Sequence, residues 1–307
     1  MQLYVLYALI VIAAGTAAGL LVYIQRSGKL SRLFLALPRT TRATLIRKPS
    51  LLKLGGETRT ITYLSCRFAN APEIEQALRA HPAQLIRLFE KRLGALYEAV
   101  LAHGGTVERF GSAGFAAYWN APLDDKEHGA HAVAAAVRMM SVIRTQNAMT
   151  VVRHEIPTPP LQLAIGLATG PATAGLFGGV YSVSGACVPR AEELRAACAE
   201  YGFAALTDAE TAAQAQQFAL LEIDRPARGT DETSAIHALL GDPGMRASPT
   251  FRALATYHER IFAALDAHDQ KEAATLISQA SQLSGASAKL YELYRRRDLR
   301  EPLRQAS

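Results

Sequence analysis

The N-terminal stretch of the chain is apolar and carries no charge. No charged side chain occurs from Leu3 to Ile24, and a helix of about 20 apolar residues spans the hydrocarbon core of a bilayer. Basic residues follow this stretch from Arg26 to Lys48, none precedes it, and no acidic residue comes before Glu57. A signal peptide would have basic residues before its apolar run, so the pattern predicts an uncleaved transmembrane anchor. Basic residues stay on the cytoplasmic side of a membrane, which sets the orientation. The predicted protein crosses the bacterial inner membrane once, with its N-terminus outside and its main domain in the cytoplasm.

Two features of this region bear on its partners. Gly15 and Gly19 form a Gly-xxx-Gly pair, which lets two helices approach closely in lipid. They are predicted as a membrane dimerisation site, with ordinary membrane-helix composition as the alternative. The segment from Arg26 to Lys48 mixes basic residues with leucines and Phe34. It is predicted either to lie on the anionic headgroups of a lipid bilayer or to be a linker that only sets topology.

Strand-like and helix-like hydrophobic periods follow one another in the central part of the chain. Alternating β-branched and aromatic residues predict strands, and apolar residues three and four positions apart predict helices. The predicted strands are 60–66, 106–110, 114–119, 161–169, 218–223 and 235–239, and the predicted helices are 73–103, 128–144 and 188–201. The order β-α-β-β-α-β at the start of this series predicts an α+β fold with a ferredoxin-like sheet.

The pattern changes after residue 244. Apolar residues on one helical face predict two antiparallel helices at 251–268 and 270–283, a helical hairpin, and a third helix at 286–297. The chain is therefore predicted to have four parts, which are a transmembrane anchor at 1–25, a basic juxtamembrane linker at 26–51, a globular domain at 52–242 and a C-terminal helical extension at 243–307.

Composition and residue spacing limit the kinds of site that the chain is expected to contain. Half of the 307 residues are hydrophobic and the formal net charge is +6, which is typical of a folded protein rather than a disordered one. The three cysteines lack metal-ligand spacing and are predicted to be reduced thiols. His128 and His131 have no third ligand nearby, so packing or surface roles are predicted rather than metal binding. The run from Arg295 to Arg297, with Arg300, is predicted to be a solvated helix face, and nucleic acid is not an expected partner.

More specific signals come from short segments in a fixed order. They are Leu-Gly-Gly-Glu at 54–57, Ile-Thr-Tyr-Leu-Ser-Cys at 61–66, His-Gly-Gly-Thr-Val at 103–107, Arg-Phe-Gly-Ser-Ala-Gly at 109–114, Ile-Gly-Leu-Ala-Thr-Gly at 165–170 and Val-Ser-Gly-Ala at 183–186. Together they resemble the catalytic domain of the class III adenylate/guanylate cyclases, from Gly55 to Leu239. The resemblance implies a class III nucleotide cyclase core. Gly178 and Gly179 are expected in a hairpin turn rather than a phosphate cradle, because no Gly-xxxx-Gly-Lys-Ser/Thr pattern is present.

The resemblance also implies positions for the functional residues of the family. In active members two aspartates bind metal ions, an asparagine orients the ribose, an arginine stabilises the transferring phosphate, an aspartate contacts the base and a lysine binds the triphosphate. This chain has Arg67 and Ala113 at the metal aspartates, Pro189 at the asparagine, Glu193 at the arginine, Ser182 at the base aspartate and Thr230 at the lysine.

These substitutions lead to an expectation about activity. Class III chemistry uses two divalent cations held by carboxylates, and donors that stabilise the transition-state charge. Arginine and alanine do not ligate hard cations. The sequence therefore predicts a degenerate cyclase-like protein that is not an enzyme and has no metal or other cofactor.

The expected function is signalling or assembly at the membrane, through homodimerisation and binding of an unidentified protein partner. One alternative is a nucleotide- or anion-binding receptor that uses the vacated cleft, with Arg67 and Arg109 as anion ligands or in an ion pair with Glu193. The other alternative is a divergent active nucleotide cyclase.

Overall fold

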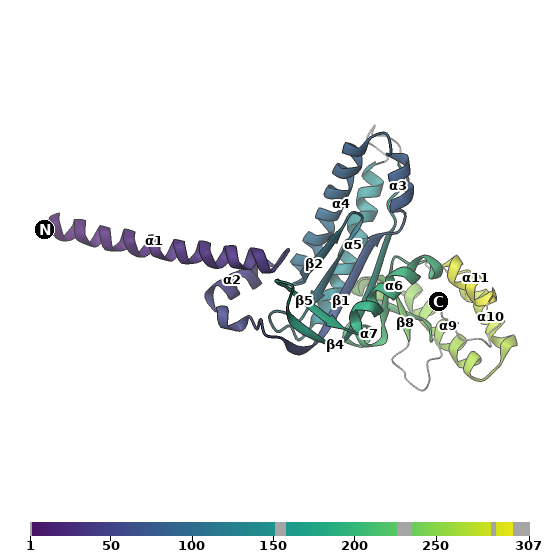
Figure 1. Ribbon diagram of the computed structural model, residues 1–307. Helices are drawn as coiled ribbons and strands as arrows, with labels where there is room; N and C mark the ends of the chain where they lie inside the picture. Colours follow the sequence, from purple (N-terminus) through teal and green to yellow (C-terminus); the bar gives the residue numbers. More distant parts are fainter. Residues whose placement is uncertain (1, 151–157, 226–234, 284–286, 297–307) are drawn as a thin grey trace.

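The computed structural model describes residues 2–150, 158–225, 235–283 and 287–296 (Figure 1). Its centre is a mixed sheet in the order β2-β3-β1-β4-β6-β8-β7, with β5 paired to β4. The strands are β1 Glu57–Phe68, β2 Thr106–Gly111, β3 Gly114–Trp119, β4 Leu163–Phe177, β5 Val180–Gly185, β6 Ala205–Asp208, β7 Ala219–Asp224 and β8 Ile236–Gly241. β4 and β6 are parallel, and the other neighbours in the sheet are antiparallel.

Helices cover both faces of this sheet and extend from its two ends. They are α1 Gln2–Leu33, α2 Arg39–Arg47, α3 Ala71–Ala77, α4 Pro82–Ala102, α5 His128–Thr150, α6 Cys187–Tyr201, α7 Ala209–Gln214, α8 Pro243–Ala247, α9 Pro249–Asp266, α10 Gln270–Ala280 and α11 Ala288–Arg296, with a short 3₁₀ turn, η1, at Pro49–Leu51. The order β1-α4-β2-β3-α5-β4 and the strand order β2-β3-β1-β4 confirm the predicted ferredoxin-like α+β core.

The central strand β1 divides the interior into two layers. Because side chains alternate along a strand, Leu64 and Phe68 pack with α4 and α5 on one face. Ile61 and Tyr63 face the other side, in the same apolar cluster as residues of α6 and of the N-terminal segment. The second face is the one that carries the candidate site.

Close backbone contact fixes α6 against this second face. A Cβ atom on Gly166 of β4 would lie 1.9 Å from the Ala191 carbonyl oxygen of α6, so only glycine allows this approach. Farther along α6, Arg195 Nε donates to Ser65 Oγ of β1 at 3.1 Å. The helix is thus held across β4 and β1.

A tight turn joins β4 to β5. Gly178 and Gly179 have φ values of 57° and 89°, in the left-handed region that glycine adopts without strain. The predicted hairpin turn is confirmed, and it places β5 beside β4 in antiparallel register from Ala172 to Phe177.

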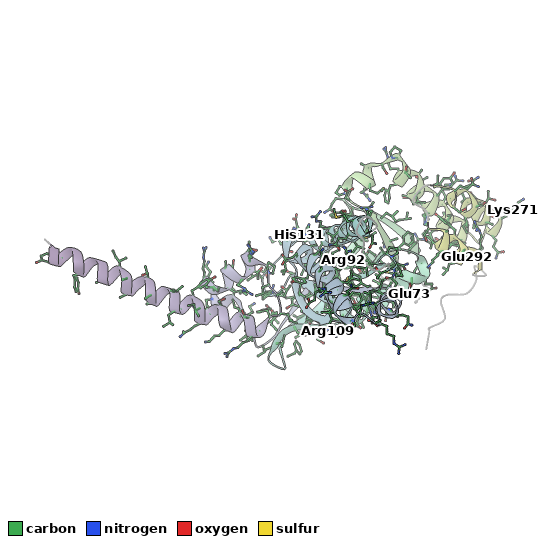
Figure 2. All side chains as sticks on the ribbon, turned by 90° about the horizontal axis from the view of Figure 1, so that it is seen from above. Glu73, Arg92, Arg109, His131, Lys271 and Glu292 are labelled. Atoms are coloured by element: carbon green, nitrogen blue, oxygen red, sulfur yellow. The ribbon has the colours of Figure 1, made fainter. Side chains whose placement is uncertain are left out.

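The N-terminal helix α1 projects from the body, and both views show it clear of the sheet (Figures 1 and 2). It runs without a break past Arg26 to Leu33, and its last turn enters the core through Leu30. Among the described helices, none meets the length and hydrophobicity that crossing a bilayer requires. The predictions of a transmembrane anchor and of a single-pass inner-membrane location are therefore wrong. The apolar start of α1 belongs instead to a longer helix whose basic, C-terminal part is built into the folded body.

The C-terminal helices form the predicted hairpin, α9 and α10, followed by α11. Their link to the sheet centres on His258, which is 2% exposed. Its Nδ1 lies 3.0 Å from the Glu222 carbonyl oxygen, so Nδ1 carries the proton, and Nε2 accepts from the Tyr291 hydroxyl at 2.7 Å. Burial lowers the pKa of His258 to about 4. Tyr294 donates to the Ile223 carbonyl in the same region. Arg297 and Arg300 lie outside the described residues.

Candidate functional site

The two positions that correspond to metal aspartates are adjacent in space. Arg67 is exposed near the end of β1, and Ala113 is 2% exposed in the β2–β3 turn. The Phe68 amide donates to the Ala113 carbonyl oxygen at 2.8 Å, which brings the two positions together. A guanidinium and a methyl group offer no oxygen ligands. The residues present therefore do not fit the pair of divalent cations that the fold family uses.

The positions on α6 are exposed and engaged locally. Pro189 lies in the first turns of the helix, and Glu193 Oε2 accepts from Arg190 Nη1 at 3.2 Å. The suggested ion pair of Arg109 with Glu193 is not the one formed, because Arg109 Nη2 lies 3.4 Å from Glu192 Oε1. Thr230 lies outside the described residues.

A carboxylate that the sequence analysis did not identify occupies the middle of the site. Glu108 of β2 is 7% exposed. One of its oxygens accepts from the Ser182 hydroxyl and from the Val183 amide at 3.2 Å, both on β5. The other oxygen accepts from the Tyr63 hydroxyl of β1 at 2.5 Å. Three strands are thus joined through one buried side chain, whose charge is stabilised by these donors.

Arg109 extends this cluster to the surface. Its Nη2 donates to the Tyr63 hydroxyl at 3.0 Å, and its Nε lies 3.9 Å from Glu108 Oε2. The pKa of Arg109 is raised, first by its hydrogen bond and electrostatic interaction with Tyr63 and then by the charges of Glu108 and Glu192. Burial and the neighbouring Glu108 raise the pKa of Tyr63, so its hydroxyl stays protonated. The Arg109 side chain, which is labelled in Figure 2, is 61% exposed and can offer donors to an anionic ligand.

The two histidines on α5 have separate partners. His128 Nδ1 lies 2.6 Å from Thr62 Oγ1 inside the protein, whereas His131 Nδ1 lies 2.8 Å from Asp125 Oδ2 near the surface. In the described part of the chain, no three or more His, Cys, Asp or Glu side chains are grouped as metal ligands would be. His128 thus joins α5 to β1, and His131 bonds the segment that precedes the helix.

The three cysteines are free and buried. Burial raises the pKa of Cys187 to about 11 and that of Cys198 to about 12. These thiols are protonated at neutral pH and are poor nucleophiles. The prediction of unlinked thiols is confirmed for all three.

Comparison with known proteins shows a similarity to nucleotide cyclases. The sequence matches no family model. Adenylate cyclase 1 of Rhizobium meliloti (strain 1021) is 27% identical over 137 residues, which make up 43% of this chain and 20% of that protein. The match thus spans about a fifth of the length of this relative.

Solved structures extend the similarity to between 61% and 73% of this chain. The guanylyl cyclase Cya2 superposes with a TM-score of 0.52 at 22% identity, covering 61% of this chain and 94% of its own. A bacterial light-regulated adenylyl cyclase gives 0.54 at 16% identity, over 73% of this chain and 64% of its own. The adenylyl cyclase CyaB from P. aeruginosa superposes with a TM-score of 0.51 at 19% identity, covering 61% of this chain and 96% of its own. The fold is that of a class III nucleotide cyclase domain.

This finding confirms the resemblance and corrects one conclusion drawn from it. The relative and the structures that share the cyclase fold are named adenylate, adenylyl or guanylyl cyclases. The prediction that the chain is not an enzyme conflicts with them and is withdrawn. That prediction treated residues that differ from the family pattern, such as Arg67 and Ala113, as a demonstrated loss of activity. Nothing in the described residues demonstrates such a loss.

Proposed function

We propose that this chain is a nucleotide cyclase-like protein that forms a homodimer and binds a purine nucleoside triphosphate at the face carrying Glu108, Arg109 and Ser182. The observation that carries the proposal is the convergence of these three side chains on a cyclase fold. The family resemblance puts a base-contacting residue near Ser182, whose hydroxyl donates to Glu108 beside the exposed guanidinium of Arg109.

The chemistry of these groups suits such a ligand. Arg109 supplies planar donors that match phosphate oxygens or a base carbonyl. Glu108 and Ser182 supply an acceptor and a hydroxyl that distinguish donor and acceptor edges of a purine. Class III domains bury one sheet face against a partner, so a second copy would complete the enclosure of the ligand. The exposed residues of α6, Pro189 and Glu193, are available to that second copy.

Nucleotide binding tests the proposal directly. Calorimetry with ATP and with GTP, each with and without Mg²⁺, should show saturable binding to the purified full chain. Arg109→Ala should weaken binding about 10- to 100-fold, since hydrogen bonds to charged groups contribute about 1.5–3 kcal/mol.

Arg260 provides a matched control. Its Nη2 also lies 3.4 Å from a glutamate, Glu272, and its side chain is 57% exposed, but it belongs to the C-terminal helices. Arg260→Ala should leave nucleotide affinity unchanged. Equal losses in the two variants, or no binding of either nucleotide at millimolar concentration, would refute the proposed site.

Turnover to a cyclic product is a second candidate function, favoured by the named activities of the relatives. Carboxylate oxygens of Glu108 and Glu192 both lie within 4 Å of the Arg109 guanidinium. Cyclic AMP and cyclic GMP should be measured with Mg²⁺ and with Mn²⁺. Product above the blank that is lost in Arg109→Ala and in Glu192→Gln, but kept in Arg260→Ala, would establish this second function at the same face.

A further inference from the structure

The segment from Leu30 to Ile46, here called the N-terminal clamp, is docked beside the candidate site. The Phe34 ring lies 5.0 Å from the Tyr181 ring of β5, with 33° between the ring planes. Phe34 is 4% exposed and Tyr181 is 1% exposed. Apolar side chains of the clamp other than Phe34 are also buried, namely Leu30, Leu37, Leu45 and Ile46. The clamp is therefore part of the core next to β5.

The clamp holds β2 as well. The Val107 amide donates to the Ala36 carbonyl oxygen at 3.1 Å, which extends the sheet beyond its edge strand by one bridge. Val107 immediately precedes Glu108, and Tyr181 immediately precedes Ser182. The clamp thus contacts both strands that carry the central hydrogen bond of the site, the one from Ser182 to Glu108.

With the clamp docked, the groups of the site are hydrogen-bonded to one another. Ser182 and the Val183 amide are bonded to Glu108, and Arg109 is bonded to Tyr63. A nucleotide that uses Ser182 or Arg109 must compete with these internal partners. The docked arrangement therefore opposes ligand binding.

The docked arrangement also contains an unsatisfied group. Among the described residues, no atom forms a hydrogen bond with the buried Tyr181 hydroxyl. A buried hydroxyl without a partner is destabilising, and exposure to water would satisfy it. Undocking of Phe34 is thus favoured by hydration of Tyr181 and opposed by the loss of apolar contacts.

A mechanical connection to α1 completes the arrangement. Leu30 belongs to α1, and Arg26 Nη1 of α1 donates to the Ile46 carbonyl oxygen of α2 at 2.8 Å. α1 is therefore connected to both ends of the clamp. We propose that the N-terminal clamp is an autoinhibitory element, which keeps Ser182 on Glu108 when docked and frees the site for a nucleoside triphosphate when α1 displaces it. This inference rests on the proposed function of the site.

Two variants should shift this equilibrium in opposite directions. Phe34→Ala removes the ring that holds Tyr181 and should increase amide hydrogen exchange in Val180–Gly185 about tenfold, with tighter ATP binding. Tyr181→Phe removes only the unsatisfied hydroxyl and should slow exchange in the same strand and weaken ATP binding. Phe34→Leu should act like Phe34→Ala, to a smaller extent, should the alanine variant fail to fold.

Phe251→Ala is the control, because Phe251 is buried to the same degree (5% exposed) but belongs to α9. It should leave exchange in β5 and ATP affinity unchanged. The proposal is overturned by unchanged β5 exchange in the Phe34 and Tyr181 variants, or by faster exchange without tighter ATP binding in a protein that binds ATP. If no variant binds ATP or GTP, the proposed function fails. Opposite shifts in β5 exchange would then still establish the clamp as the element that holds β5.

Discussion

Helix α1 and the C-terminal helices α9 to α11 are both additions to the cyclase sheet, and they are joined to it in different ways. α9 and α10 each bury one face, through residues such as Leu254 and Leu276. α1 is apolar around its whole circumference near its start, and Leu20 and Leu21 are 60% and 58% exposed. The amphipathic helices α9 and α10 each have one apolar face, and that face packs on the body. The described apolar side chains of α1 from Val11 to Ile24 are exposed instead, so apolar content alone does not place a helix in this body.

The largest expected effect is on the free energy of unfolding, when one leucine is truncated in each of the two regions. Leu276→Ala should lower the free energy of unfolding by about 2–5 kcal/mol, because it leaves a cavity where the side chain was 2% exposed. Leu20→Ala should change it by less than about 0.5 kcal/mol. Urea denaturation followed by circular dichroism measures both. A loss of similar size in the two variants would show that α1 is packed as firmly as α10.

Acid should weaken the C-terminal helices specifically. The folded pKa of His258 is lowered to about 4 from 6.5, so the folded state resists protonation more than the unfolded state does. Stability should be unaffected by His258 above about pH 6.5 and should fall as the pH drops from 6.5 towards 4, by on the order of 3 kcal/mol. Comparison of unfolding free energies at pH 7 and pH 4.5 in wild type and in His258→Gln measures this contribution.

The matched control for this pH effect is His268, an exposed histidine between α9 and α10. Asn tolerates the positive φ of 59° at this position, so His268→Asn should keep the full acid sensitivity. Loss of the pH dependence in this control rather than in His258→Gln would show that burial of His258 is not its cause.

A smaller effect is expected from one hydroxyl. Tyr291→Phe removes the donor to His258 Nε2. It should lower the free energy of unfolding by about 1–2 kcal/mol, since a buried acceptor is left unpaired. Tyr4→Phe, in the exposed part of α1, where the side chain is 82% exposed, should cost nothing measurable. Thermal unfolding of the two variants in parallel measures the difference. If Tyr291→Phe unfolds at the same temperature as Tyr4→Phe, this hydrogen bond does not stabilise the packing of α11.

The smallest effect concerns self-association through α1. We propose that Gly15 and Gly19 allow two copies of α1 to approach closely. Apart from the neighbouring residues and backbone of α1 itself, no heavy atom of the described chain lies within 4 Å of a Cβ placed on either glycine, so Gly15→Ile with Gly19→Ile should not disturb the fold. The double variant should weaken self-association of the full chain a few-fold in analytical ultracentrifugation. Gly28→Ile, also free of neighbours within 4 Å, should not. Unchanged association would assign the pair to ordinary composition.

The parts of the fold that could be predicted from sequence have strong local patterns. The β2–β3 pair, α6 and the C-terminal hairpin follow from regular periods bounded by glycine or proline. The strand β6 was missed, because Ala205–Asp208 is only four residues long and is held by parallel pairing with the distant β4. Helix α2 was missed because its apolar residues are few and lie among basic ones.

The candidate site shows a similar limit. The family resemblance located Arg67, Ala113 and Ser182, but it did not indicate Glu108. A register shift between Val107 and Arg109 of β2 breaks the alternation of inward and outward side chains. Val107 and Glu108 are consecutive and both buried. Alternation alone would have assigned one of them to the surface, so the buried carboxylate was visible only in three dimensions.

The length of α1 has a consequence for how its motion can be observed. At 1.5 Å per residue, the helix from Gln2 to Leu30 is about 42 Å long. If it pivots about its docked end, a tilt of about 5° moves the tip by about 4 Å while the docked side chains shift by a fraction of an ångström. A small rotation of the clamp therefore produces a much larger displacement at the N-terminal end of α1. A fluorescent or spin label at the exposed Tyr4 would turn such rotations into a measurable change of distance to the sheet.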